Sequence, residues 1–242
     1  LSSIPQIIAG DGQDKGFTIL NVLLKNFIGD RDVIYFIIIA ALCMLCVTYT
    51  YRKYSYSFAL SIFLFVISTD AYQWLFNGMR QFIPAAILFA CMGLILKKKY
   101  IPLVIIILIV STVHLSALLM IPCIFIVQGK PWNKKTMFFL VAVVVIILFV
   151  DRFTDVLETF LANTQYDDVA EQFQYDDGTN LLRVLVYSVP PLLALIGRKQ
   201  IAVIDSPIIN LSINISIISM GIYIVSMFTS GIYIGRLPIY FS

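Results

Sequence analysis

Two short segments of this chain place ionisable side chains in otherwise apolar surroundings. NGMRQFIPAA (77–86) begins an apolar run with Arg80, and STVHLSALLMIP (111–122) surrounds His114, the only histidine. Ionisable groups at membrane depth are costly, so each is a candidate for function. An imidazole exchanges protons near neutral pH, and a guanidinium can clamp a phosphate through paired N–H bonds. We therefore expect proton transfer and anion binding at these two segments.

Further residues extend this candidate site. Ser116 supplies a hydroxyl two residues after His114, and Arg236 lies between Gly235 and Pro238 near the end of the sequence. Two arginines and one buried imidazole suit a phosphorylated substrate better than a sugar alone. Arg80 also has a simpler interpretation, an interfacial arginine whose head extends to the lipid headgroups.

The composition predicts an all-α polytopic membrane protein. Of the 242 residues, 60% are hydrophobic and 13% are charged, and the mean hydropathy is +0.92. A soluble domain carries about twice that share of charge. The net charge of +3 comes from short basic clusters between apolar runs, which indicates membrane topology and no nucleic-acid partner.

We expect about eight membrane segments in a single transmembrane domain over 1–242. Residues 1–32 form an interfacial segment on the outer face, in which 17–29 has the apolar spacing of an amphipathic helix. Residues 70–80 are expected to be a loop with aromatic anchors, and 151–180 an acidic outer-face loop. The predicted membrane segments lie at about 33–51, 55–70, 81–96, 100–128, 136–150, 181–197 and 208–229. Residues 100–128 count as two of the eight segments, the two legs of a hairpin.

Residues 100–128 allow two arrangements. One straight helix would reach ~44 Å, against a hydrocarbon core of ~30 Å. A re-entrant hairpin would have legs at about 101–112 and 115–128, with its apex at His114. The hairpin places ten of the seventeen lysines and arginines on the cytoplasmic side of the membrane, whereas the single span places eight there. The positive-inside rule therefore favours the hairpin. Non-helical backbone at that depth must face protein or a water-filled cavity.

Other chemistry lacks support in the sequence. The acidic loop does not follow the EF-hand pattern, and no nucleotide-binding, serine-hydrolase or zinc-protease motif occurs, so we predict no metal and no cofactor. The four cysteines lie inside apolar runs and are interpreted as small buried hydrophobic residues. They are Cys43, Cys46, Cys91 and Cys123.

The order of these segments resembles a known family. GFTILNVLLKNF, then NGMRQFIPAAI, a lysine cluster, VHLSALLMIP, a tyrosine-rich polar loop and a closing GRLPIYF are similar to the EpsG-like members of the Wzy-type polymerases of bacterial exopolysaccharide, O-antigen and capsule. The resemblance covers essentially the whole chain. It implies a GT-C-like helical bundle, and the family's additional spans lead us to expect a sequence truncated at both ends.

The resemblance implies a metal-independent glycosyltransferase on the outer face of the bacterial cytoplasmic membrane. It would join polyprenyl-pyrophosphate-linked oligosaccharide repeats, in the bilayer and alongside other polysaccharide-assembly membrane proteins. His114 would be the catalytic base, with Asp70 as a second candidate. Arg80 and Arg236 would bind the pyrophosphate; Gln81 and Ser116 complete the predicted binding site.

Two other classes of function remain open from the sequence. A flippase or other transporter of lipid-linked oligosaccharide would use the same basic groups without a base, but such proteins usually contain internal repeats. A polysaccharide-modifying membrane acyltransferase would need its histidine toward the cytoplasmic half, where the acyl donor arrives.

Overall fold

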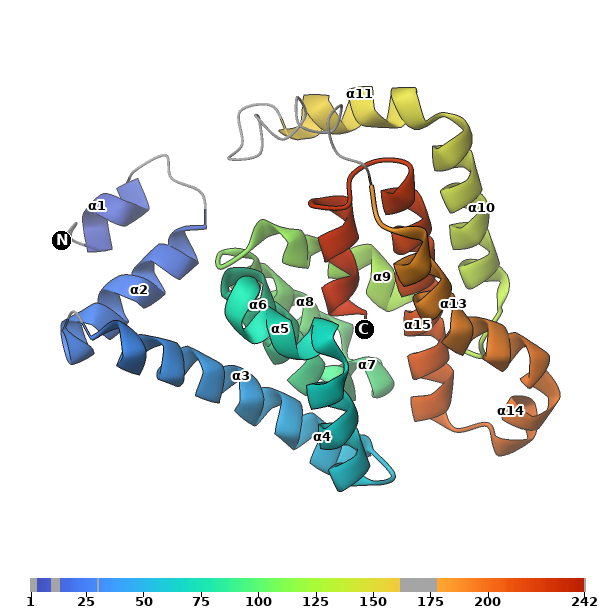
Figure 1. The fold of residues 1–242 in the computed structure, drawn as a ribbon, viewed down its shortest axis with the longest axis horizontal. Coiled ribbons are helices and arrows are strands. Elements are labelled where there is room, and N and C mark those ends of the chain that lie inside the picture. The colour runs from blue at the N-terminus through green and yellow to red at the C-terminus, as the bar shows by residue number, and fades with distance from the viewer. Residues whose placement is uncertain (1–3, 10–13, 30, 162–177, 242) are drawn as a thin grey trace. The chain divides into compact units, whose positions relative to one another are not determined.

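The computed structural model describes residues 4–9, 14–29, 31–161 and 178–241. In these ranges the chain forms α-helices, short 3-10 helices and turns, without a strand. The predicted all-α fold is therefore confirmed for this part of the chain (Figure 1). The chain packs as two compact units, Leu1–Ile121 and Pro122–Ser242, called here the first and second unit. A single transmembrane domain over 1–242 stays a prediction.

The first unit contains eight α-helices and one 3-10 helix within its described residues. They are α1 (Ile4–Ala9), α2 (Lys15–Ile28), α3 (Asp32–Tyr54), α4 (Phe58–Ile67), α5 (Thr69–Asn77), α6 (Met79–Ala90), α7 (Met92–Leu96), α8 (Tyr100–Ser111) and η1 (Leu115–Leu119); α9 (Met120–Ile126) crosses the boundary between the units.

Helix α3 packs along α6 through one apolar stripe. Its buried residues Ile39, Cys43, Val47 and Thr50 recur every three or four positions, which places them on one face of the helix. Thr50 Oγ1 donates to the carbonyl of Phe89 on α6 at 3.3 Å. Because most of α6 is itself buried, this pairing forms the centre of the first unit. The four cysteines are free thiols, of which Cys43 and Cys123 are fully buried.

The second unit is built around its longest helix, α15. The described elements of the unit after α9 are α10 (Lys134–Leu148), α11 (Val150–Leu161), α13 (Leu181–Ile196), α14 (Arg198–Ile204), α15 (Pro207–Met227) and η2 (Ile234–Tyr240). Helices α10 and α13 and the 3-10 helix η2 all pack against α15. Gly221 permits the close approach of α10, because a Cβ there would lie 2.5 Å from the Phe139 ring. Asn214 is fully buried and donates to the carbonyls of Val127 and Gly129 at 2.9 and 3.0 Å.

Two of the described helices, α3 and α15, are long and apolar enough to cross a membrane. Two bent pairs raise that number to four if each pair is one broken span: α4 with Ala71–Asn77, bent by 57°, and α13 with α14, bent by 73°. Large apolar side chains of α3, including Phe36, Ile37 and Leu45, are exposed on its surface, as a lipid-facing helix requires. These helices identify a membrane protein.

The expected count of about eight membrane segments is not confirmed. Helices α6 and α8 have twelve residues each, so each reaches only ~18 Å, short of the ~30 Å hydrocarbon core. The predicted span at 81–96 is interrupted at Cys91, between α6 and α7.

Two predicted loops are helical. The loop expected at 70–80 lies mostly in α5, and the loop expected at 151–180 begins with α11. Their charged and polar residues suggested irregular structure, but apolar residues also recur there at helical spacing, as in an amphipathic helix. Leu75 of α5 is accordingly buried while Gln73 is exposed. The rest of the acidic loop, 162–177, lies outside the described residues.

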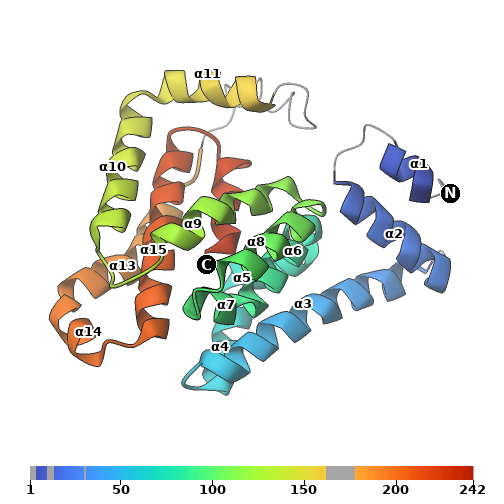
Figure 2. The ribbon, with the colours of Figure 1, turned by 180° about the vertical axis from the view of Figure 1, so that it is seen from behind.

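The predicted break within 100–128 is confirmed. Helix α8 ends at Ser111 and η1 begins at Leu115. The two elements are in contact, and the chain turns after α8 (Figure 2). This break contains neither glycine nor proline. Instead, Ser111 and Thr112 donate their hydroxyls to carbonyls three residues back, at 2.8 and 2.7 Å, which competes with continued helix. The position of this turn in the bilayer stays a prediction.

Candidate functional site

Arg80 lies in the first turn of α6, directly before a buried apolar stretch. Gly78 precedes this helix, and a Cβ there would lie 2.1 Å from the Trp74 ring, so glycine allows the indole to pack against the start of α6. The Arg80 side chain is 44% exposed. Its backbone is therefore anchored by a packed helix while its guanidinium reaches the surface of the unit.

Asp14 holds the guanidinium of Arg80. Arg80 Nη1 lies 2.9 Å from Asp14 Oδ2, and the Asp14 side chain is 3% exposed. The guanidinium carbon also lies 5.1 Å from the centre of the Phe17 ring, within cation–π range. Arg80 is thus fixed by an ion pair and an aromatic contact, which a freely snorkelling arginine does not need.

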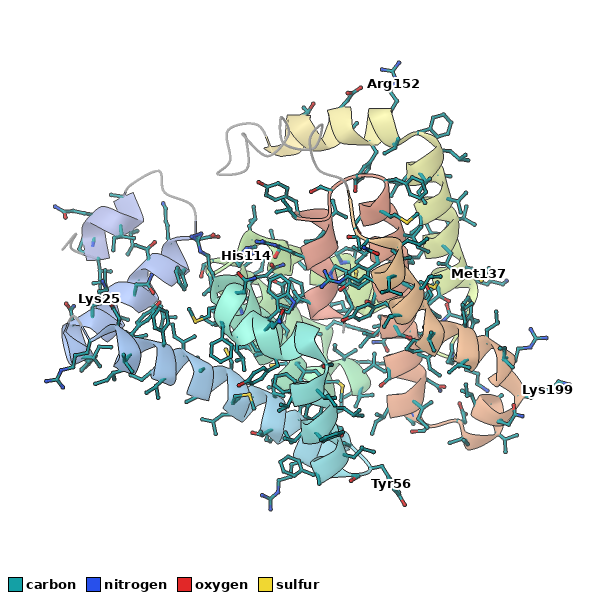
Figure 3. All side chains as sticks on the ribbon, viewed as in Figure 1. Lys25, Tyr56, His114, Met137, Arg152 and Lys199 are labelled. Carbon is teal, nitrogen blue, oxygen red and sulfur yellow. The ribbon has the colours of Figure 1, made fainter. Side chains whose placement is uncertain are left out.

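A hydrogen-bonded line runs from α6 to the turn at 112–114. Gln81 Nε2 donates to Ser116 Oγ at 3.4 Å, and Ser116 Oγ lies 2.7 Å from His114 Nδ1. Gln81 is buried and Ser116 is half-buried. His114, labelled in Figure 3, is also half-buried. Arg80 and Gln81 are adjacent, so one turn of α6 contributes both the guanidinium and the start of this line.

The geometry around His114 determines its neutral tautomer. His114 has extended backbone (φ −153°, ψ 119°), and its Nδ1 accepts the backbone N–H of Ser116 at 3.3 Å, capping η1. Because a backbone N–H can only donate, Nδ1 is an acceptor and the neutral ring carries its proton on Nε2. Ser116 Oγ then donates to the same Nδ1 while accepting from Gln81. The basic nitrogen of His114 therefore faces the Ser116 hydroxyl.

The start of α2 is fastened to the same turn. Gly16 N donates to the carbonyl of Thr112 at 2.9 Å, and a Cβ on Gly16 would lie 2.2 Å from Thr112 Oγ1. Sequence reasoning missed both Asp14 and Gly16, and treated this stretch as a polar lead-in to an amphipathic helix. The available signal was an aspartate immediately before the apolar periodicity, a common helix-start residue.

Two other predicted residues are carried by other elements. Arg236 is exposed on η2 and belongs to the second unit. Asp70 lies on α5, and its side chain is outside the described ones. No group of three or more His, Cys, Asp or Glu side chains within the described ranges is placed to hold a metal ion. Within the first unit, Arg80 is paired with Asp14, and Gln81, Ser116 and His114 are linked by hydrogen bonds.

These groups can stabilise an anion and move a proton within one unit. A guanidinium offers five N–H donors in a planar fork that matches phosphate oxygens. An imidazole linked to a hydroxyl can receive a proton through that hydroxyl.

The described helices are those of a membrane protein, and its candidate site consists of a guanidinium on α6 and an imidazole–serine pair at the turn before η1. The chain belongs to the EpsG family, whose family model matches residues 2–242. This membership confirms the resemblance seen in the sequence and links the chain to exopolysaccharide polymerisation. Neither a curated protein nor a solved structure matches the chain.

Proposed function

We propose that this protein is a glycosyltransferase that polymerises polyprenyl-pyrophosphate-linked oligosaccharide repeats into exopolysaccharide, capsule or O-antigen. It would work on the outer face of the bacterial cytoplasmic membrane, within a GT-C-like bundle. The observation that carries the proposal is the line from Gln81, beside Arg80, through Ser116 to His114. Membership of the EpsG family supports a polysaccharide polymerase, and the proposed substrate class follows from that activity.

The proposed reaction transfers the growing chain from its lipid carrier to the next repeat. A hydroxyl oxygen of the acceptor sugar attacks the anomeric carbon of the donor, forming the new glycosidic bond. The bond between that carbon and the pyrophosphate oxygen breaks, and its electron pair leaves with the polyprenyl pyrophosphate. The hydroxyl proton passes to the enzyme.

Ser116 and His114 provide the path for this proton. The acceptor hydroxyl would give its proton to Ser116 Oγ as Ser116 passes its own proton to His114 Nδ1, which leaves an imidazolium. The 2.7 Å separation between Ser116 Oγ and Nδ1 supports this transfer. Gln81 orients the serine by donating to its oxygen. Asp70 stays the second candidate base.

Arg80 and Arg236 would stabilise the negative charge that grows on the departing pyrophosphate. A fixed guanidinium contributes most where charge develops in the transition state. Arg80 is held by Asp14 and Phe17, so little reorganisation is needed during the reaction. A guanidinium in this role would supply the positive charge that a metal ion could otherwise provide, so the proposed reaction is metal-independent.

The deciding experiment supplies purified protein in a bilayer with a lipid-linked repeat unit and resolves product lengths. A ladder of chain lengths that persists in EDTA supports a metal-independent polymerase, and Ser116→Ala should reduce it strongly. Movement of the intact repeat across the bilayer without a ladder would indicate a flippase. A repeat that gains an acyl group without gaining length would indicate an acyltransferase.

A further inference from the structure

Asp14 is the most deeply buried partner among the ion pairs of the described residues. Its carboxylate is 3% exposed and lies 2.9 Å from Arg80, whereas the Lys130–Asp205 and Arg152–Asp155 pairs are separated by 3.9 Å with both partners largely exposed. A buried charge is unfavourable unless it is paired and hydrogen-bonded. The Asp14–Arg80 pair is therefore held closed, whereas the surface pairs open readily.

The backbone at Asp14 is shaped for this contact. Asp14 adopts a left-handed conformation (φ 55°, ψ 38°) immediately before α2, which few residues other than Gly, Asn and Asp tolerate. Its carbonyl accepts from Phe17 N and Thr18 N at 2.9 and 3.2 Å. In this conformation the backbone of Asp14 starts α2 while the Asp14 carboxylate contacts Arg80.

The same short segment reaches the turn that carries His114. Two residues after Asp14, Gly16 donates to the Thr112 carbonyl and packs closely on this residue. Residues 14–16 therefore connect α6, which carries Arg80, to the turn preceding η1. The same three-residue segment thus contacts Arg80 and, at Thr112, the turn that precedes His114.

We propose that Asp14 is a positioning residue that orients the Arg80 guanidinium toward the pyrophosphate of the lipid carrier. This inference rests on the proposed function and adds to it a residue from the start of α2. Asp14 itself does not touch the substrate. It fixes one edge of the planar fork, so that the guanidinium approaches the phosphate oxygens in a single orientation.

The binding test uses purified protein in lipid nanodiscs and polyprenyl pyrophosphate without sugar as the probe. Asp14→Asn keeps the left-handed backbone and the size of the side chain but removes the charge. It should weaken binding by about tenfold, as expected for a lost charge-assisted contact. Affinity that is unchanged or tighter in Asp14→Asn overturns the proposal, since a carboxylate that merely competed with phosphate would weaken binding in the parent.

Asp205 provides a matched control for this substitution. It is also a left-handed aspartate (φ 42°) with a lysine partner, but its side chain is 56% exposed. Asp205→Asn should bind polyprenyl pyrophosphate like the parent. An equal loss in both variants would show a general charge effect and overturn the specific role of Asp14.

The kinetic test separates positioning from a structural role. In the ladder assay, Asp14→Asn should lower kcat by up to about a hundredfold, because small misplacements of a catalytic group are costly, and change KM less. A fall in folded protein with unchanged kcat per folded molecule would overturn the proposal.

The two assays distinguish failure of this inference from failure of the proposed function. A parent protein that makes the ladder but is insensitive to Asp14→Asn leaves the polymerase standing and removes the role of Asp14. A parent protein that makes no ladder but binds polyprenyl pyrophosphate in an Asp14-dependent manner removes the polymerase and leaves the role of Asp14 standing. A parent that does not bind the probe overturns both.

Discussion

Replacing Arg80 by lysine separates phosphate binding from membrane anchoring. A snorkelling arginine needs only a long stem and a positive head, so lysine should replace it with little loss. A guanidinium that holds phosphate oxygens needs its planar fork, which an ammonium cannot reproduce. We therefore expect Arg80→Lys to lose most of the polymerising activity.

The contacts of Arg80 show how the effect of Arg80→Lys should divide between the free energy of unfolding and the activation free energy. Lysine keeps the positive charge beside Asp14, and the Arg80 side chain is 44% exposed, so the stability change should stay below about 1 kcal/mol. Loss of one preorganised donor at the developing charge should raise the activation free energy by about 3 kcal/mol. That corresponds to a rate loss of about a hundredfold, far larger than the effect of destabilisation.

The assay compares the initial rate and the chain-length distribution at matched amounts of folded protein. Arg152→Lys is the control, because Arg152 is 85% exposed and its ion pair with Asp155 is long, at 3.9 Å; it should leave both measurements unchanged. The reasoning is refuted if Arg80→Lys stays within a few-fold of the parent. Arg80 would then be an anchor, and the proposed pyrophosphate site would lose its main residue.

Three further results are expected. His114→Gln should abolish polymer while protein level and lipid-linked substrate persist, because glutamine cannot accept the proton; near-normal activity would make His114 structural. Asn214→Leu should lower the free energy of unfolding by about 2 kcal/mol, since it leaves two carbonyls that Asn214 binds without their donor; an unchanged unfolding midpoint in denaturing detergent would contradict this. Cysteines that replace Lys98 and Lys134 should both resist an impermeant thiol reagent applied outside, whereas a cysteine that replaces Asp168 should react. Labelling of the cysteines at positions 98 and 134 from opposite sides of the membrane would exclude the hairpin.

The sequence determined the helical class and the local features of the site. The long apolar run at about 33–51 predicted the membrane-crossing length of α3, because about 20 apolar residues are needed to cross the bilayer. The break before His114 was also readable, since a helix through 100–128 is too long for the bilayer. The helices α5 and α11 were missed because amphipathic helices and loops share polar residues, and their difference lies in a packed face.

Only the tertiary structure decided which distant residues meet. Arg80 and Asp14 are 66 positions apart, and Gln81 and Ser116 are 35 apart. No spacing rule connects such residues, because their contact depends on how α2, α6 and η1 pack together. The sequence supplied a guanidinium, and an imidazole with a serine two residues away, as candidates; the packing gave the first its buried carboxylate and the second its contact with Gln81.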